Sequence, residues 1–100
     1  MRNPGTNHGV IVIGAGIGGL AAAAELAAKG VAVTVLEAQA TPGGKLREVP
    51  AGNMPGAPLL DGGPTVFTMR WVFDALFDAL GTSTESALAL RPATLLARPA

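Results

Sequence analysis

Residues 10–20 read Val-Ile-Val-Ile-Gly-Ala-Gly-Ile-Gly-Gly-Leu, a short β-branched run that passes directly into glycines. The run at 10–13 is typical of a strand buried on both faces, as in a parallel sheet. Helix-forming residues follow from Ile17 to Lys29, and Gly30 stands where a left-handed helix cap belongs. A second β-rich run covers residues 31–36. The stretch therefore predicts strand, glycine turn, helix and parallel strand, which is the start of an α/β fold.

The glycines between the first strand and the helix fit the pattern G-x-G-x-x-G at positions 14, 16 and 19. The first glycine permits the tight turn, the second lets a pyrophosphate approach the backbone, and the third lets the helix pack closely on the sheet. The pyrophosphate would lie at the helix N-terminus, where unpaired N–H groups and the helix dipole favour an anion. The predicted cofactor-binding residues of this loop are Gly14, Ala15, Gly16, Ile17, Gly18 and Gly19.

An acidic residue ends the second predicted strand. Glu37 follows Gly19 by 18 residues, the position from which a carboxylate accepts hydrogen bonds from the hydroxyls of an adenosine ribose. The same carboxylate would repel a 2′-phosphate, which disfavours NADP. Taken singly, the glycines fit an ordinary turn and Glu37 a solvated strand end, but their combination predicts dinucleotide binding. We include Glu37 and Ala38 among the cofactor-binding residues.

The rest of the chain predicts shorter elements. Residues 45–49 form a candidate strand, and residues 59–61 are expected to pair back with it as a hairpin. The apolar periodicity of residues 70–80 predicts a helix, with Thr68 as its N-cap and Gly81 as its stop. Beyond Glu85, residues 88–90 and 95–96 suggest weak strands. Because no second crossover helix returns to a third parallel strand, we expect an incomplete sheet and a chain that is the N-terminal piece of a longer flavoprotein.

Composition excludes several classes of function. Seven basic residues balance seven acidic ones, so no electrostatic case for binding nucleic acid arises. There is no cysteine and His8 is the single histidine, which excludes a disulfide framework, a cysteine-ligated zinc and a multi-histidine metal site. Residues 3–24 carry no Asp, Glu, Lys or Arg, but Pro4 and several glycines interrupt them, so neither a membrane span nor a signal peptide is expected. The absence of cysteine fits a cytoplasmic protein.

Residues 10–37, followed by Gly43, Gly44 and Lys45, resemble the FAD-binding start of the flavin amine oxidase and carotenoid desaturase superfamily. The segment at 61–69, with Gly63, Pro64 and Thr65, resembles the bacterial carotenoid desaturases, and residues 70–77 are most similar to those that act on hydroxyneurosporene in phototrophic bacteria. The resemblance covers about residues 10–90. It implies a Rossmann-like FAD-binding fold and adds to the predicted site Gly43, Gly44, Lys45, Gly63, Pro64 and Thr65. Lys45 or Arg47 would offset cofactor or substrate charge.

The resemblance also implies an activity, which is the introduction of a C=C bond into an apolar carotenoid by hydride transfer to FAD and loss of a proton from the neighbouring carbon. Residues 1–9 would be a flexible leader, 10–69 the FAD-binding segment and 70–100 a helix and the beginning of a substrate domain. No acid or base is assigned within the chain, and contact with a membrane would be peripheral, through regions outside it. Two alternatives stay open: another enzyme of the superfamily, such as a phytoene desaturase or an amine or protoporphyrinogen oxidase, and a truncated non-catalytic dinucleotide-binding module.

Overall fold

The computed structural model describes residues 8–95 and 97–99. Most of the predicted leader, residues 1–7, lies outside this range, as does Leu96 of the last predicted strand. The chain divides into two compact units, one ending at Thr65 and the other beginning at Val66.

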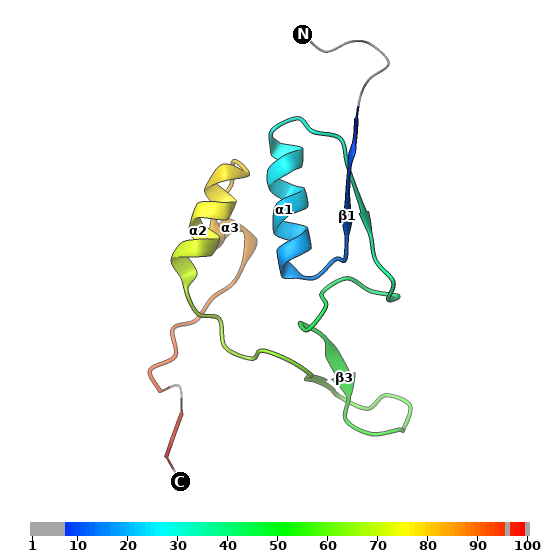
Figure 1. Ribbon diagram of the computed structural model, residues 1–100. Helices are drawn as coiled ribbons and strands as arrows, with labels where there is room; N and C mark the ends of the chain where they lie inside the picture. Colours follow the sequence, from blue (N-terminus) through cyan, green and yellow to red (C-terminus); the bar gives the residue numbers. More distant parts are fainter. Residues whose placement is uncertain (1–7, 96, 100) are drawn as a thin grey trace. The chain divides into compact units, whose positions relative to one another are not determined.

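The first unit begins with the predicted strand, helix and strand. Strand β1 (Val10–Ile13) leads into helix α1 (Ile17–Ala28), which returns the chain to strand β2 (Val33–Leu36) (Figure 1). The two strands pair in parallel, with Val10 opposite Val33 and Ile13 opposite Leu36. The α/β class predicted from the sequence is confirmed.

Strand β2 starts two residues later than predicted, because Gly30 and Val31 form hydrogen bonds that close the C-terminal end of α1. Lys29 is the C-cap, Gly30 has a φ of +82°, and the Val31 N–H donates to the Leu26 carbonyl at 3.1 Å. The Gly30 N–H donates to the Ala27 carbonyl at 2.9 Å, which completes a Schellman cap. The predicted stop at Gly30 is therefore confirmed, and Val31 belongs to the cap.

The two faces of this small sheet differ. Val12 and Val35 are half-buried on the face covered by α1, whereas Ile11, Ile13 and Leu36 are exposed on the other, with Ile13 at 87 %. Within the part of the chain that the structure describes, only one face of the sheet is covered. This agrees with the expectation of an incomplete sheet, because parallel strands are otherwise buried on both sides.

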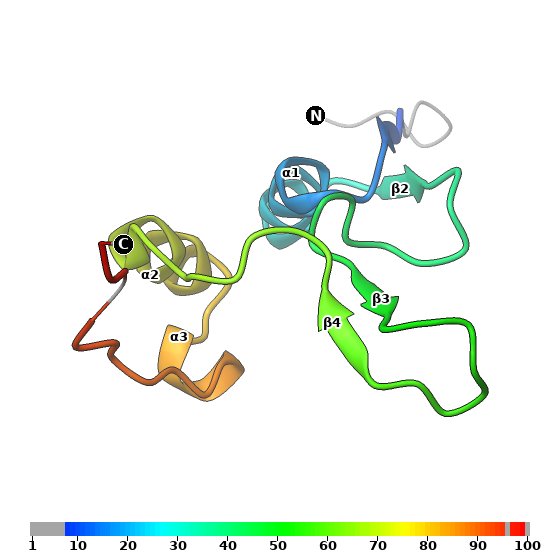
Figure 2. The same ribbon diagram turned by 90° about the horizontal axis from the view of Figure 1, so that it is seen from below.

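A hairpin completes the first unit. Strand β3 (Glu48–Pro50) pairs antiparallel with β4 (Leu59–Asp61), and Glu48 lies opposite Asp61 (Figure 2). The hairpin is confirmed, but its first strand begins at Glu48 and not at residue 45 as predicted. The Leu46 N–H donates to the Gly43 carbonyl at 3.0 Å, so residues 43–46 form a turn before the strand begins.

The second unit contains helix α2 (Arg70–Ala79) and the four-residue helix α3 (Thr84–Ala87). Gly81, with a φ of +79°, follows the C-cap Leu80 in a second Schellman arrangement, so the predicted stop is confirmed. Apolar residues of α2 gather on one side, and the rings of Phe67 and Phe73 lie 4.4 Å apart.

Two predictions for this unit are wrong. The N-cap of α2 is Met69, in the left-handed region with a φ of +53°, and its side chain makes no capping hydrogen bond, so Thr68 does not cap the helix. Residues 88–90 form no strand; they follow α3, whose N-cap Ser83 accepts from the Ser86 N–H at 3.2 Å. The alternating leucines of residues 88–90 do not form a strand because the described part of this unit contains no strand for them to pair with.

A polar network joins the two helices of this unit. Thr84 is only 1 % exposed, and its hydroxyl donates to Asp74 Oδ1 at 2.5 Å. Arg70 donates to the same carboxylate and also pairs with Glu85 of α3. The Thr84 hydroxyl first, and then Arg70, lower the pKa of Asp74 below its usual range, so the carboxylate keeps its charge in mildly acidic solution.

The left-handed conformation at Met69 generates a stability prediction. A non-glycine residue in this region costs roughly 1 kcal/mol, which glycine avoids. Met69→Gly is therefore expected to unfold at a higher temperature than Met69→Ala, the control that removes the side chain but keeps the backbone strain. Thermal unfolding of the two variants in the full-length protein measures the difference; equal midpoints would show that residue 69 is unstrained.

Candidate functional site

Two glycine-containing segments meet at the carboxyl ends of β1 and β2, and a third packs against the second of them. The first two are the loop between β1 and α1 and the turn at Gly43 and Gly44, and the third is the Gly62-Gly63 pair that follows β4. All three belong to the first unit. Ligands of open α/β sheets bind at this end of the strands, so the junction is the candidate site.

The first loop leaves the backbone donors of α1 accessible to a ligand. Gly14 turns the chain with a φ of +99°, a conformation that glycine adopts without strain, while its N–H donates to the Leu36 carbonyl at 2.7 Å. Gly16 is the N-cap of α1 and has no side chain to occupy the first N–H groups. No acidic residue lies in the first turn, where it would compete with an anion.

The third glycine of the motif brings helix and strand together. A Cβ at Gly19 would lie 2.0 Å from the Gly14 carbonyl oxygen and 3.3 Å from a methyl group of Val12. One helix turn later, Ala23 is buried against the sheet. Gly19 therefore serves the packing predicted for it, whereas a Cβ at Gly18 would meet open space.

The peptide of Ala15 connects the first loop to two other segments. Its N–H donates to Glu37 Oε2 at 2.7 Å, and its carbonyl accepts from the Gly43 N–H at 2.7 Å. Ala15 itself is 3 % exposed. Both backbone polar atoms of this buried residue are thus paired, the N–H by the side chain that ends β2 and the carbonyl by the second glycine turn.

The two carboxylate oxygens of Glu37 accept hydrogen bonds from two different loops. Oε2 accepts from Ala15, and Oε1 accepts from the Gln39 N–H at 3.0 Å. The Gln39 N–H makes the largest contribution to lowering the pKa of Glu37, followed by the Ala15 N–H; the Arg47 charge contributes less. The group is therefore a hydrogen-bond acceptor that stays ionised below the usual range of a glutamic acid.

The second glycine turn lies against the first loop. A Cβ at Gly44 would lie 3.2 Å from Gly16 Cα, so a side chain at Gly44 would require the first loop to shift by a few tenths of an ångström. Together with the Gly43–Ala15 hydrogen bond, this contact makes one surface of the two loops. Of the predicted site residues, the first loop, Glu37 and this turn are brought together.

The Gly62-Gly63 segment packs on the far side of the second turn. A Cβ at Gly63 would lie 1.8 Å from the Lys45 carbonyl oxygen, and the Gly62 N–H donates to the Arg47 carbonyl at 2.7 Å. Position 63 therefore requires glycine because of its contact with protein backbone. Pro64 and Thr65 are exposed and make no hydrogen bond to the glycine turns among the described residues.

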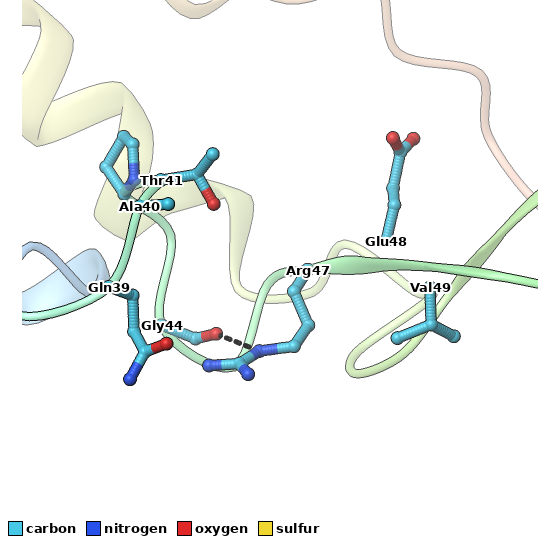
Figure 3. A pocket seen from close by; sticks show the side chains of 8 residues that line it. Gln39, Ala40, Thr41, Gly44, Arg47, Glu48 and Val49 are labelled. Carbon is cyan, nitrogen blue, oxygen red and sulfur yellow. Dashed lines mark hydrogen bonds between the residues drawn. The ribbon is translucent and has the colours of Figure 1, made fainter.

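A pocket of about 250 Å³ opens beside the second turn (Figure 3). Arg47 spans it, and its Nε–H donates to the Gly44 carbonyl at 2.8 Å. Figure 3 places the guanidinium near the Gln39 side chain and directs Glu48 away from it. The lining residues are Gln39, Ala40, Thr41, Pro42, Gly44, Arg47, Glu48 and Val49.

Sequence reasoning did not identify the contacts of Gly62 or the choice between the two cations near the second turn. Arg47 is oriented by Gly44, whereas Lys45 makes no described hydrogen bond or ion pair through its side chain. The two adjacent glycines at 62 and 63 were the available signal for close backbone packing. Ala38, also predicted for the site, is exposed beside Glu37.

The geometry defines a dinucleotide-binding unit of Rossmann type: a parallel β1-α1-β2 crossover with a glycine loop, a helix N-terminus and an acid ending β2. A family model described as "NAD(P)-binding Rossmann-like domain" matches residues 12–80. The chain belongs to this family of Rossmann-like dinucleotide-binding domains.

The chain is, more particularly, a homologue of the hydroxyneurosporene desaturases over their N-terminal part. It is 53 % identical over 100 residues to the hydroxyneurosporene desaturase of Rubrivivax gelatinosus and 60 % identical over 89 residues to that of Rhodobacter capsulatus. The zeta-carotene-forming phytoene desaturase of Myxococcus xanthus is 41 % identical over 81 residues. These matches cover the whole chain, 89 % and 81 % of it, but only 18 %, 17 % and 15 % of the respective relatives.

The described residues contain neither a membrane-spanning helix nor a cluster of metal-ligating side chains. No helix among them has the length and hydropathy needed to cross a membrane. Across residues 8–95 and 97–99, no three His, Cys, Asp or Glu side chains gather as they would around a metal ion.

The contrast between Gly18 and Gly19 yields a matched pair of substitutions in one helix turn. Gly19→Ala must displace the Gly14 carbonyl, so it is expected to destabilise the protein by about 1–3 kcal/mol. Gly18→Ala meets no atom within 4 Å and is expected to be neutral or to stabilise slightly, since alanine favours the helix. Thermal unfolding of the cofactor-free full-length protein distinguishes them; equal losses would contradict the close packing at Gly19.

Proposed function

We propose that this chain is the FAD-binding N-terminal part of a carotenoid desaturase. The homology to hydroxyneurosporene desaturases supports the family, and the substrate class follows from the names of those relatives. Because the chain spans less than a fifth of their length, the proposal concerns the whole protein, to which these residues contribute cofactor binding.

The observation that carries FAD as the cofactor is the backbone contact between the two glycine turns. Gly44 lies against Gly16, and the Gly43 N–H is bonded to Ala15. A second glycine turn fused to the phosphate loop supplies more backbone beside the ligand than the single loop that a nicotinamide dinucleotide requires. Two such turns resemble the FAD-binding start of the flavin amine oxidase and carotenoid desaturase superfamily, which supports FAD as the cofactor.

Glu37 disfavours NADP through its charge. The pKa of its carboxyl is lowered by the Gln39 and Ala15 N–H groups, so the group is an anion at neutral pH. An anion at the end of β2 accepts hydrogen bonds from ribose hydroxyls and repels a 2′-phosphate. FAD carries hydroxyls at this position, whereas NADP carries the phosphate.

Within the proposed site, the accessible N–H groups at the start of α1 would receive the pyrophosphate, and Lys45 or Arg47 would balance its charge. The proposed cofactor-binding residues are Gly14, Ala15, Gly16, Ile17, Gly18, Gly19, Glu37, Ala38, Gly43, Gly44, Lys45, Gly63, Pro64 and Thr65. When bound, FAD supplies the hydride acceptor for desaturation.

We further propose that residues 10–69 form the cofactor segment and residues 70–100 the beginning of a substrate domain. The apolar carotenoid would then be held by parts of the protein outside this chain. The same parts would make any peripheral contact with a membrane. A cytoplasmic location at the membrane surface suits an enzyme whose cofactor is polar and whose substrate is a lipid.

Gly16→Ala separates cofactor binding from folding. Its backbone has a φ of −77° and a Cβ there would meet no protein atom within 4 Å, so the folding stability should fall by no more than the ~1 kcal/mol by which an N-cap prefers glycine to alanine. A pyrophosphate approaching this backbone would collide with the methyl group, and FAD affinity is expected to fall about 100-fold, or by roughly 3 kcal/mol. Flavin fluorescence titration measures the affinity, with Gly9→Ala as the control, because Gly9 precedes β1 at the end away from the loop and a Cβ there would make only ordinary contacts with Ala32; unchanged FAD binding by Gly16→Ala would contradict the proposed cradle.

The proposed cofactor and substrate are tested on the full-length protein. Titration of the cofactor-free protein is expected to give tight binding of FAD and at least tenfold weaker binding of NADPH. Anaerobic addition of a 1-hydroxylated C40 carotenoid should bleach the flavin absorbance, whereas benzylamine should not. Preferential binding of NADPH would overturn the cofactor, and bleaching by the amine alone would identify an amine oxidase.

A further inference from the structure

The two oxygens of the Glu37 carboxylate accept N–H groups from opposite sides. Oε2 accepts from Ala15 in the first loop, at 2.7 Å, and Oε1 accepts from Gln39 in the segment after β2, at 3.0 Å. These are hydrogen bonds of ordinary length to an ionised acceptor, which is the stronger class of hydrogen bond. The side chain thus connects two backbone segments that are 22 and 2 residues away along the chain.

The bond to the Ala15 N–H controls the orientation of the peptide group that joins Gly14 to Ala15. Since the Ala15 carbonyl is held by the Gly43 N–H, the residue is fixed at both its amide and its carbonyl. Gly14 and Gly16 have no side chains that would restrain the loop in other ways. The direction in which Gly16 presents the start of α1 to a ligand therefore depends on this pair of hydrogen bonds.

We propose that Glu37 is a positioning residue for the phosphate loop, which it holds through the Ala15 N–H, in addition to the ribose contact expected from its place at the end of β2. This inference rests on the proposed function for the identity of the ligand. The positioning itself is a property of the protein alone.

The two roles are compatible because each carboxylate oxygen has two lone pairs. One lone pair on each oxygen serves the backbone, which leaves one on each for a ribose hydroxyl. The charged group that faces this carboxylate from the neighbouring turn is Arg47, whose positive charge favours the ionised form. Protonation of Glu37, which the lowered pKa of its carboxyl moves to more acidic solution, would remove acceptor capacity and weaken its hold on the loop.

Glutamine cannot reproduce this arrangement. Its amide has nearly the same shape as the carboxylate but presents one acceptor oxygen and one donor group. With two N–H groups to satisfy, one of them must face the amide nitrogen of the glutamine. Aspartate keeps two acceptor oxygens on a shorter side chain, and Glu48→Gln alters an exposed carboxylate that is directed away from Arg47.

The first test is hydrogen exchange in the cofactor-free full-length protein. Glu37→Gln is expected to raise the exchange rate of the Ala15 amide at least tenfold, with partial rescue by Glu37→Asp and no change in Glu48→Gln. A Glu37→Gln protein with wild-type exchange at Ala15 would overturn the inference. Should Glu37→Gln fail to fold, Glu37→Asp provides the comparison, since its shorter reach must still accelerate exchange at Ala15 relative to Glu48→Gln.

The second test removes the ribose contact from the ligand. FAD and an FAD analogue whose adenosine ribose lacks both hydroxyls are titrated into the wild-type, Glu37→Gln and Glu48→Gln proteins. If Glu37 positions the loop, Glu37→Gln will bind the analogue about five- to tenfold more weakly than the wild type does. If Glu37 acts on the ribose alone, the substitution will not change the affinity for the analogue, and the inference fails while FAD binding stands. A wild-type protein that binds neither flavin overturns the proposed function, whereas the exchange test still decides the positioning role.

Discussion

The backbone N–H and carbonyl of Ala15 are the groups on which the arrangement of the site depends. Ala15 is buried between two glycines, and buried backbone polar atoms must be paired. Glu37 pairs the N–H and Gly43 pairs the carbonyl, so the end of β2 and the second turn are held at the same residue. The hydrogen-bonding requirement of one buried residue thereby brings together segments that are distant in sequence.

Close contact between backbones accompanies these hydrogen bonds. Gly19 lies on the Gly14 carbonyl, Gly44 on Gly16 and Gly63 on the Lys45 carbonyl, and at none of these contacts is there room for a side chain without a shift. In the described residues the buried apolar side chains are those of two alanines, while larger ones such as Ile13 are exposed. The first unit is therefore organised by backbone packing and hydrogen bonding around the loops, with few large side chains involved.

This organisation explains which features were predictable from sequence. The β1-α1-β2 unit follows from local signals: a β-branched run, helix formers and a glycine at the cap each act over a few residues. The ends of both longer helices at Gly30 and Gly81 were predictable because a left-handed cap needs only one residue. In contrast, Met69 adopts a left-handed conformation that methionine disfavours. It is the N-cap of α2 although Thr68, one residue earlier, is the better capping residue.

Amino-acid sequence by itself determined the fold class, the place of the glycine loop and the acid at the end of β2, because these depend on periodicity and on residue types at fixed spacing. Only the tertiary structure decided that Glu37 reaches Ala15, that Gly44 lies on Gly16 and that Gly63 packs against Lys45. These contacts join residues separated by long stretches of chain, and their geometry depends on how the loops close. No local sequence pattern specifies how the loops pack on one another, so the partner of each glycine depends on the tertiary structure.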